Sequence, residues 1–221
     1  MNIIGFNLAK THYGLPLDNG GACLVVDGEV RLMINEERLT RKQYDAGFAK
    51  SVSYLLTHSG LRLDDVDLFV ASSCLEPVRN VYGVQRALFE AGFDVPQEKI
   101  RVCDHHDSHA YSAYYPSGFD EALVLVADGD GNVLDDVMVS GTANPEQYWN
   151  NRMEHTSYYV ARGNDVTLLE RDHAAPGENG LGGAYRYFTY FCGFPGYKYA
   201  GKLMGLAAYG AKRNRFADLR I

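Results

Sequence analysis

The stretch EALVLVA at Glu121–Ala127, followed by Asp128-Gly129-Asp130-Gly131, decides the fold because it repeats the pattern with which the chain opens. Asn2–Leu8 is also a short and mostly apolar run. It is too short for a helix and is predicted to be a β-strand. Each run begins a series of further strands. Identity between the two series is slight, so the repeat lies in the pattern, and it indicates two related halves that meet at a cleft.

The first series continues as a hairpin. Asp27-Gly28 is a strong two-residue turn signal, because both turn positions need a positive φ. Gly60 and Gly92 each follow a run with helical spacing and are expected to end a helix. The predicted elements of the first half are strands at Ala22–Val26, Glu29–Ile34, Val66–Ala71 and Ile100–Cys103, and helices at Ala49–Ser59, Val81–Ala91 and Ala110–Tyr115. In the second half, further strands are expected at Val137–Ser140, Ser157–Val160 and Val166–Glu170.

The fold class is predicted to be α/β. A strand-hairpin-strand-helix unit that occurs twice is how actin-like folds are built, and a generic α/β sandwich is the alternative that the pattern leaves open. We expect a first half over residues 1–118 and the start of a second half over 119–221. No clear closing elements follow the second series, so the second half is expected to be incomplete.

Composition excludes several classes of protein. Of the 221 residues, 46% are hydrophobic and 22% are charged, which is ordinary for a globular protein. No run approaches the ~18 apolar residues of a membrane span, and the first residues lack the pattern of a secretory signal. The net charge of −7 disfavours non-specific binding of nucleic acid. Four widely spaced cysteines without a CxxC pair are expected to be reduced and mostly buried in a cytoplasmic protein: Cys23, Cys74, Cys103 and Cys192.

The pair His105-x-x-x-His109 is the sharpest local signal. Residues four apart share one face of a helix, so both imidazoles can reach one metal ion. Imidazole nitrogens suit divalent transition metals, and a carboxylate usually completes such a site. The pair follows a predicted strand end, and Asp128 follows another, so Asp128 is the candidate third ligand. The alternative is two exposed or packing histidines.

Other motifs leave more than one interpretation open. The glycines of Asp128–Gly131 can let backbone N–H groups approach a phosphate, although a plain turn is the simpler interpretation. The charged run Asn35–Arg38 with Thr40-Arg41-Lys42 is expected to be a solvated face, and the alternative is that some of its groups are carried into the cleft. The aromatic face formed by Tyr185, Phe188 and Phe191 is expected to pack in the core. Small residues over Ala200–Gly210 indicate close helix packing or backbone near a ligand.

The chain resembles the O-carbamoyltransferases of the NodU/CmcH type, which act in nodulation-factor and antibiotic biosynthesis. The family motifs stand here in order along the whole chain. They are Gly5-x-Asn7, Gly21-Ala22-Cys23-Leu24 with Asp27-Gly28, Glu36-Glu37-Arg38-Leu39-Thr40-Arg41, His105-His106-Asp107-Ser108-His109-Ala110-Tyr111-Ser112-Ala113-Tyr114-Tyr115, Asp128-Gly129-Asp130-Gly131, Gly182 to Phe194, and Gly201-Lys202-Leu203-Met204-Gly205-Leu206-Ala207-Ala208-Tyr209-Gly210.

The resemblance implies an actin-like fold similar to that of the threonylcarbamoyl transferases. It also implies carbamoyl transfer to a hydroxyl of a small molecule, from a carbamoyl-adenylate that a YrdC-like domain makes from ATP and carbamoyl phosphate. Carried over, the metal ligands are His105, His109 and Asp128, with iron(II) expected and manganese or magnesium as substitutes. His106 is expected beside the phosphate. The residues expected to line the adenylate site are Gly129, Gly131, Gly182, Gly201 and Lys202.

Two departures from the family pattern matter. The family's His-Asp pair falls on Asp18-Asn19, so a catalytic histidine is missing, and Asp18 or His12 is expected to replace it. Relatives also continue well past Gly210 and include the YrdC-like domain. The chain is therefore expected to be the N-terminal part of such an enzyme, a split subunit or a truncated protein. It would need the missing part, or a partner chain with a YrdC-like domain.

Two other functions remain as alternatives. The first is a non-catalytic half that binds a nucleotide or a partner chain. The second is a threonylcarbamoyl transferase-type protein that modifies tRNA, and the acidic net charge argues against it.

Overall fold

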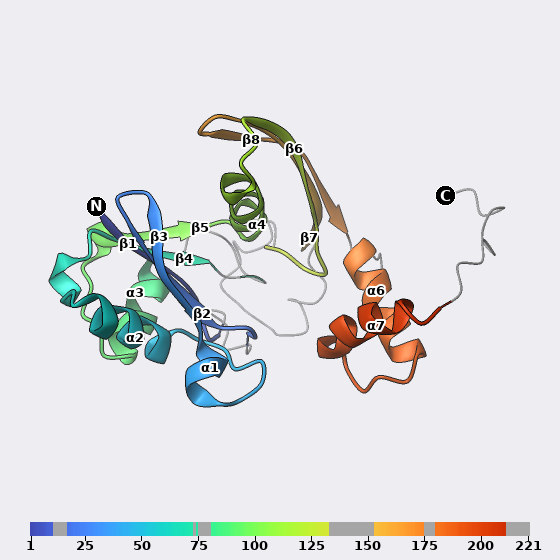
Figure 1. Cartoon of the computed structure of the whole chain (residues 1–221), viewed down its shortest axis with the longest axis horizontal. Helices are drawn as coiled ribbons and strands as arrows, with labels where there is room; N and C mark the ends of the chain where they lie inside the picture. Colours follow the sequence, from blue (N-terminus) through green and yellow to red (C-terminus); the bar gives the residue numbers. More distant parts are fainter. Residues whose placement is uncertain (11–16, 73, 75–80, 133–152, 175–179, 211–221) are drawn as a thin grey trace, which may run out of the picture.

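The structure is a computed structural model that describes residues 1–10, 17–72, 74, 81–132, 153–174 and 180–210. His12 and the strand predicted at Val137–Ser140 lie outside these residues. The described part contains two β-sheets and the helices around them (Figure 1).

The first sheet has the strand order β3-β2-β1-β4-β5. The first three strands form an antiparallel meander, and β4 and β5 run parallel to β1. Positive φ angles of 51° at Asp27 and 85° at Gly28 confirm the predicted hairpin. The five strands are β1 (Asn2–Asn7), β2 (Gly21–Val26), β3 (Glu29–Asn35), β4 (Leu68–Ser72) and β5 (Ile100–Cys103).

Helices α2 (Ala49–Ser59) and α3 (Val81–Glu90) cover one face of this sheet (Figure 1). The first ends at Gly60 in the left-handed conformation, as expected. Their apolar faces meet the sheet in a core whose fully buried members include Ile4, Leu55, Phe69, Leu88 and Ile100. The remaining elements of this half are α1 (Glu36–Thr40) and the 3₁₀ turns η1 (Leu63–Asp65), η2 (Gln97–Lys99) and η3 (Tyr115–Ser117).

The second sheet is an antiparallel meander in the order β6-β7-β8. Strand β6 spans Glu121–Ala127, the residues predicted for it. The expected strands at 157–160 and 166–170 lie within β7 (Met153–Arg162) and β8 (Asp165–Ala174). A meander therefore begins near residue 2 and again near residue 121, which confirms the repeated pattern.

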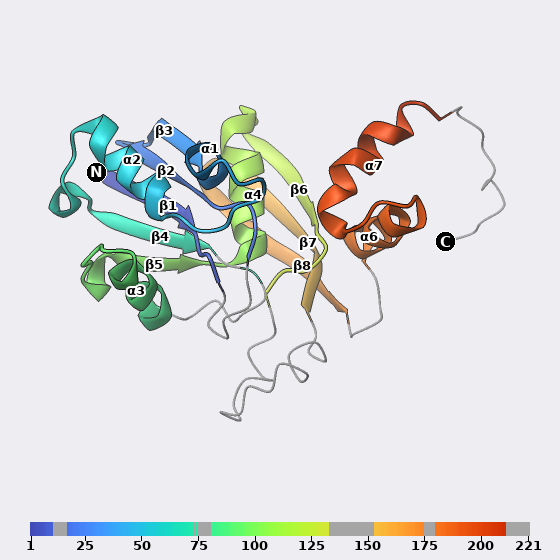
Figure 2. The ribbon, with the colours of Figure 1, turned by 90° about the horizontal axis from the view of Figure 1, so that it is seen from below.

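Helix α4 (His105–Tyr114) follows β5 of the first sheet but packs against the second sheet (Figures 1 and 2). Its Ala110 joins Val126 of β6 and Tyr159 of β7 in a small core. The Tyr114 hydroxyl also donates hydrogen bonds to the carbonyl oxygens of Asp120 and Gly163. The helix thus joins the two sheets, and the boundary at residue 118 remains a prediction.

Helices α6 (Leu181–Phe191) and α7 (Ala200–Ala207) follow the second sheet, joined through the turn η5 (Tyr197–Tyr199). The prediction of core packing for the aromatic face of α6 is wrong. Tyr185, Phe188 and Phe191 are 37%, 60% and 87% exposed, because the buried positions of α6 are the small residues Gly183 and Thr189.

Two further expectations need correction. Glu36 is buried rather than solvated, because its carboxylate accepts hydrogen bonds from the N–H groups of Lys50 and Ser51 at the start of α2. The four cysteines, all of them among the described residues, form no disulfide with one another, but Cys192 is exposed and the other three are only half-buried. Among the described helices, none has the length and apolar character needed to cross a membrane.

Candidate metal centre between the two sheets

The start of α4 places two histidines on one face. The Asp104 carboxylate caps the helix by accepting hydrogen bonds from the N–H groups of His106, at 2.9 Å, and Asp107, at 3.4 Å. Aspartate is a preferred residue at this position, because its oxygen accepts from otherwise unpaired N–H groups. One helical turn then brings the Nε2 atoms of His105 and His109 to within 3.2 Å of each other.

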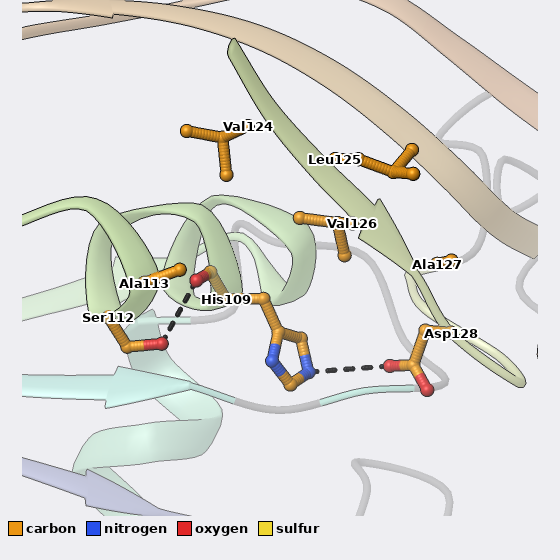
Figure 3. Close-up of a pocket in the computed structure, with 8 residues that line it drawn as sticks. All are labelled: His109, Ser112, Ala113, Val124, Leu125, Val126, Ala127 and Asp128. Carbon is orange, nitrogen blue, oxygen red and sulfur yellow. Dashed lines mark hydrogen bonds and ion pairs between the residues drawn. The ribbon is translucent and has the colours of Figure 1, made fainter. Parts of the chain in front are cut away.

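Asp128 meets these imidazoles from the end of β6. Its Oδ2 atom lies 2.8 Å from His105 Nε2 and 3.3 Å from His109 Nε2. Figure 3 shows the His109 ring pointing at this carboxylate. Burial alone would raise the pKa of Asp128, but hydrogen bonds with the two histidines outweigh it and hold the pKa well below its usual range.

This cluster fits the chemistry of a metal site. One ligand atom from each of the three residues lies within 4.8 Å of the others. Two imidazole nitrogens and a carboxylate oxygen are a donor set that suits iron(II) and related divalent metals. The structure brings the three predicted ligands together from two elements, and the binding of an ion there remains a prediction.

A hollow of about 320 Å³ opens beside the cluster (Figure 3). His109 and Asp128 line one end of it, and Ser112 and Ala113 of α4 with residues 124–127 of β6 line the rest. A molecule in this hollow can therefore reach the ligand atoms of His109 and Asp128.

His106 lies behind the cluster and is fully buried. Its Nδ1 is 2.6 Å from Ser157 Oγ, whereas Nε2 has no hydrogen-bond partner among the described residues. Burial lowers the pKa of His106 to about 4, so the ring is neutral near pH 7. Its predicted place beside a phosphate remains a prediction.

Two of the predicted adenylate-site glycines, Gly129 and Gly131, follow β6 in its turn, and a third, Gly182, lies in α6 against that turn. A Cβ on Gly182 would stand 2.4 Å from the carbonyl oxygen of Asp128, so the start of α6 lies directly against this turn. A Cβ on Gly131 would stand 2.7 Å from His106 Nε2, and one on Gly129 would stand 3.1 Å from the Arg186 guanidinium. These glycines permit close packing around Asp128.

Gly201 and Lys202 lie on α7, where the contacts differ. A Cβ on Gly201 would meet open space among the described residues. The Lys202 ammonium lies 4.5 Å from the centre of the Tyr199 ring. The assignment of both residues to an adenylate site therefore stays a prediction.

Asp18, one of the two candidate replacements for the missing catalytic histidine, is paired. Its carboxylate lies 2.6 Å from Lys198 Nζ and accepts a hydrogen bond of 2.6 Å from the Tyr197 hydroxyl. These contacts join the first half to η5. The other candidate, His12, lies outside the described residues.

A buried ionic cluster beneath α4 escaped the sequence analysis. It consists of Asp104, Asp107, Glu154, Tyr159 and Arg171. Glu154 lies in β7 and Arg171 lies in β8. The one sequence signal for this cluster is the presence of charged residues within strands that cover a core. Burial, with repulsion from Asp104, raises the pKa of Glu154 to about 7.

Fold and site together define a two-sheet α/β protein with a His-His-Asp cluster where the sheets meet. Residues 81–219 match the family model described as "Carbamoyltransferase N-terminus", and the chain belongs to this family. The two sheets, with the helices around them and the meander that occurs twice, confirm the predicted α/β fold class.

Curated relatives are much longer than this chain. An uncharacterised protein of Synechocystis is 30% identical over an alignment 237 positions long, and the match covers 91% of this chain and 34% of the relative. The nodulation protein NolNO of Sinorhizobium fredii is 30% identical over 146 residues, covering 57% of this chain and 22% of NolNO. The chain thus spans about a third or less of the curated relatives that it matches.

Among solved structures, YeaZ from Pseudomonas aeruginosa overlaps with a TM-score of 0.43 and 14% sequence identity. The overlap covers 80% of this chain and 68% of YeaZ. The fold class rests on the two sheets and their strand order and not on this overlap.

Proposed function

We propose that the chain supplies the metal-containing part of an enzyme that transfers a carbamoyl group. The observation that carries this proposal is the cluster of His105, His109 and Asp128 in a chain of the carbamoyltransferase N-terminus family. A divalent metal, iron(II) before manganese or magnesium, suits the donor set. When bound, it would supply a Lewis acid for a phosphate or carbonyl oxygen and orient the acceptor.

The donor in this proposal is a carbamoyl-adenylate made from ATP and carbamoyl phosphate. The acceptor is a hydroxyl group of a small molecule, in the biosynthesis of a natural product. Gly129 and Gly182 are proposed to line the adenylate site, where the absence of a side chain at Gly182 lets the start of α6 lie directly against the turn after β6. Neutral His106, held by Ser157, would keep an uncharged ring behind the ligands during transfer.

The adenylate-forming, YrdC-like part is proposed to lie on a further polypeptide segment or a partner chain. Exposed apolar side chains on two elements support this proposal. They are Phe188 and Phe191 of α6, and Leu123 and Leu125 of β6. A partner would bury such surface, since large exposed apolar patches mark sites of protein interaction.

A metal-binding measurement tests whether the cluster of His105, His109 and Asp128 holds a divalent ion. His105→Ala with His109→Ala is expected to abolish binding of one divalent ion, measured as metal content by plasma emission. The control is His58→Ala, because His58 lies in α2, where its ring centre is 3.7 Å from that of Tyr54 and its Nδ1 is 2.9 Å from the Tyr54 carbonyl oxygen. Unchanged metal content in the double variant would contradict the proposed metal site.

Product analysis tests the reaction itself. The chain is combined with a separately made YrdC-like part, ATP, carbamoyl phosphate and candidate polyols, and the products are examined by mass spectrometry. We expect a carbamoylated hydroxyl with the complete mixture and none with the chain alone. Transfer by the chain alone would contradict the proposed division of labour.

A non-catalytic half that binds a nucleotide or a partner is the second candidate. The pairing of Asp18 with Lys198 and Tyr197 favours it, because both oxygens of this carboxylate are already engaged, one by the Lys198 ammonium and the other by the Tyr197 hydroxyl. This candidate predicts nucleotide or partner binding without product in the complete mixture.

A further inference from the structure

Arg171 of β8 lies at the centre of the buried cluster beneath α4. Its guanidinium forms ion pairs with Asp104 at 3.1 Å, with Asp107 at 3.3 Å, and with Glu154. It also donates a hydrogen bond of 3.2 Å to the Tyr159 hydroxyl. The Arg171 side chain is only 18% exposed, so these contacts form largely out of water.

One arm of the cluster reaches the helix that carries both histidines. Asp104 caps the first turn of α4, and Asp107 lies within that turn. Arg171 holds both carboxylates, and the Tyr159 hydroxyl donates to Asp107 at 2.9 Å. The position and direction of the first turn of α4 therefore depend on contacts made by one guanidinium.

The other arm reaches the turn that follows Asp128. Glu154 pairs with Arg171 and accepts a hydrogen bond of 2.9 Å from the Asn132 N–H. Asn132 in turn accepts a hydrogen bond of 2.7 Å from the His105 N–H through its side-chain oxygen. The two segments that bear the ligands are thus tied to each other and to Arg171.

We infer that Arg171 is a positioning residue, which holds the start of α4 and the turn after β6 in the relative arrangement that His105, His109 and Asp128 need to bind one ion. This inference rests on the proposed metal centre. No atom of Arg171 touches the three ligands in the contacts described, so its effect passes through Asp104, Glu154 and Asn132.

Arginine is needed at this position because its planar fork can serve several carboxylates at once. Lysine offers a single point charge and cannot reproduce the paired geometry. Three carboxylates face one guanidinium here, so loss of the charge would leave the buried Asp104 and Glu154 and the half-buried Asp107 without this cation. Arg171→Lys therefore tests geometry while it keeps the charge.

The test compares metal binding by the wild-type chain, Arg171→Lys and Arg171→Met, with Co²⁺ as the probe. Affinity comes from titration, and ligand geometry comes from the visible absorption of bound Co²⁺. Loss of such an outer contact typically weakens metal binding by about 10- to 100-fold, and we expect this range for Arg171→Lys together with an altered spectrum. A merely structural role would lower the thermal midpoint but leave the spectrum of the folded chain unchanged.

Arg162→Met is the matched control. Arg162 lies in the same sheet and pairs with Glu121, but its side chain is 71% exposed. We expect wild-type affinity and spectrum in this variant. If Arg171→Met does not fold, the double variant R171M/E154Q is tested in its place, because it removes one buried charge of each sign. The same loss of metal affinity is expected in this double variant.

Wild-type affinity and an unchanged spectrum in Arg171→Lys would overturn the inference while the metal centre stands. Absence of Co²⁺ binding by the wild-type chain would overturn the metal centre and the inference with it. The two failures are therefore distinguished by the wild-type titration alone.

Discussion

Substitution of Gly182 by alanine should displace the turn that carries Asp128. Gly182 is the second residue of α6, and a Cβ there would stand 2.4 Å from the carbon and the oxygen of the Asp128 carbonyl. It would also stand 2.5 Å from the Gly129 nitrogen. All three atoms belong to the backbone, so no side-chain rotation can relieve the contact.

The size of the displacement follows from these distances. Non-bonded heavy atoms prefer about 3.5 Å or more, so α6 and the turn must separate by about 1 Å. Overpacking of this kind costs about 1–3 kcal/mol of stability, while alanine in a helix returns up to about 1 kcal/mol. A shift of about 1 Å in Asp128 relative to His105 should weaken metal binding by tenfold or more, by comparison with losses caused by disturbed ligand orientation.

The assay pairs urea unfolding with metal titration of the folded chain. Gly201→Ala is the control, because a Cβ at Gly201 meets open space and the site lies within α7. We expect Gly201→Ala to bind metal as the wild type does. Wild-type metal affinity and an unchanged unfolding midpoint in Gly182→Ala would refute the reasoning.

Three further outcomes are expected. Leu88→Ala, at a fully buried site of α3, should lose about 2–5 kcal/mol in urea unfolding, and a loss below 1 kcal/mol would contradict the described core. Because the pKa of Glu154 in the folded chain, about 7, lies above its ordinary 4.5, its carboxyl favours the folded state at low pH, and this advantage is lost as the pH rises through about 7. The stability of the wild type relative to Glu154→Gln should therefore fall over that rise, and a constant or increasing difference in urea melts would argue against the raised pKa. A double-mutant cycle of Asp18→Asn and Lys198→Met should give a coupling of up to about 1 kcal/mol, whereas strictly additive losses would mean that the ion pair does not hold η5.

The strands could be predicted from sequence because their signals are local. Asp27-Gly28 can adopt the positive φ angles of a tight hairpin, and Gly60 ends α2 for a related reason. The run Glu121–Ala127 is apolar and bounded by turn residues, so its ends were also clear. The two histidines of the proposed metal centre could also be predicted, because His105 and His109 share a helical face whatever surrounds them.

Arg171 could not be predicted in the same way. Its importance comes from contacts with Asp104, Asp107 and Glu154, and the nearest of these is 17 residues away in the chain, so no spacing rule brings them together. The prediction that the aromatic face of α6 packs in the core was wrong for a different reason. Periodicity identifies an apolar face but does not say what covers it, and the described structure buries Gly183 and Thr189 instead.

The position of α4 has a mechanical consequence. The helix is joined covalently to β5 of the first sheet, yet its core contacts are with the second sheet, which also carries Asp128. Opening or closing of the two halves would therefore pivot near Cys103 and Asp104, and would carry all three ligands along as one rigid body. The geometry of the proposed metal centre would survive such a movement, while its distance from any molecule bound on the first sheet would change.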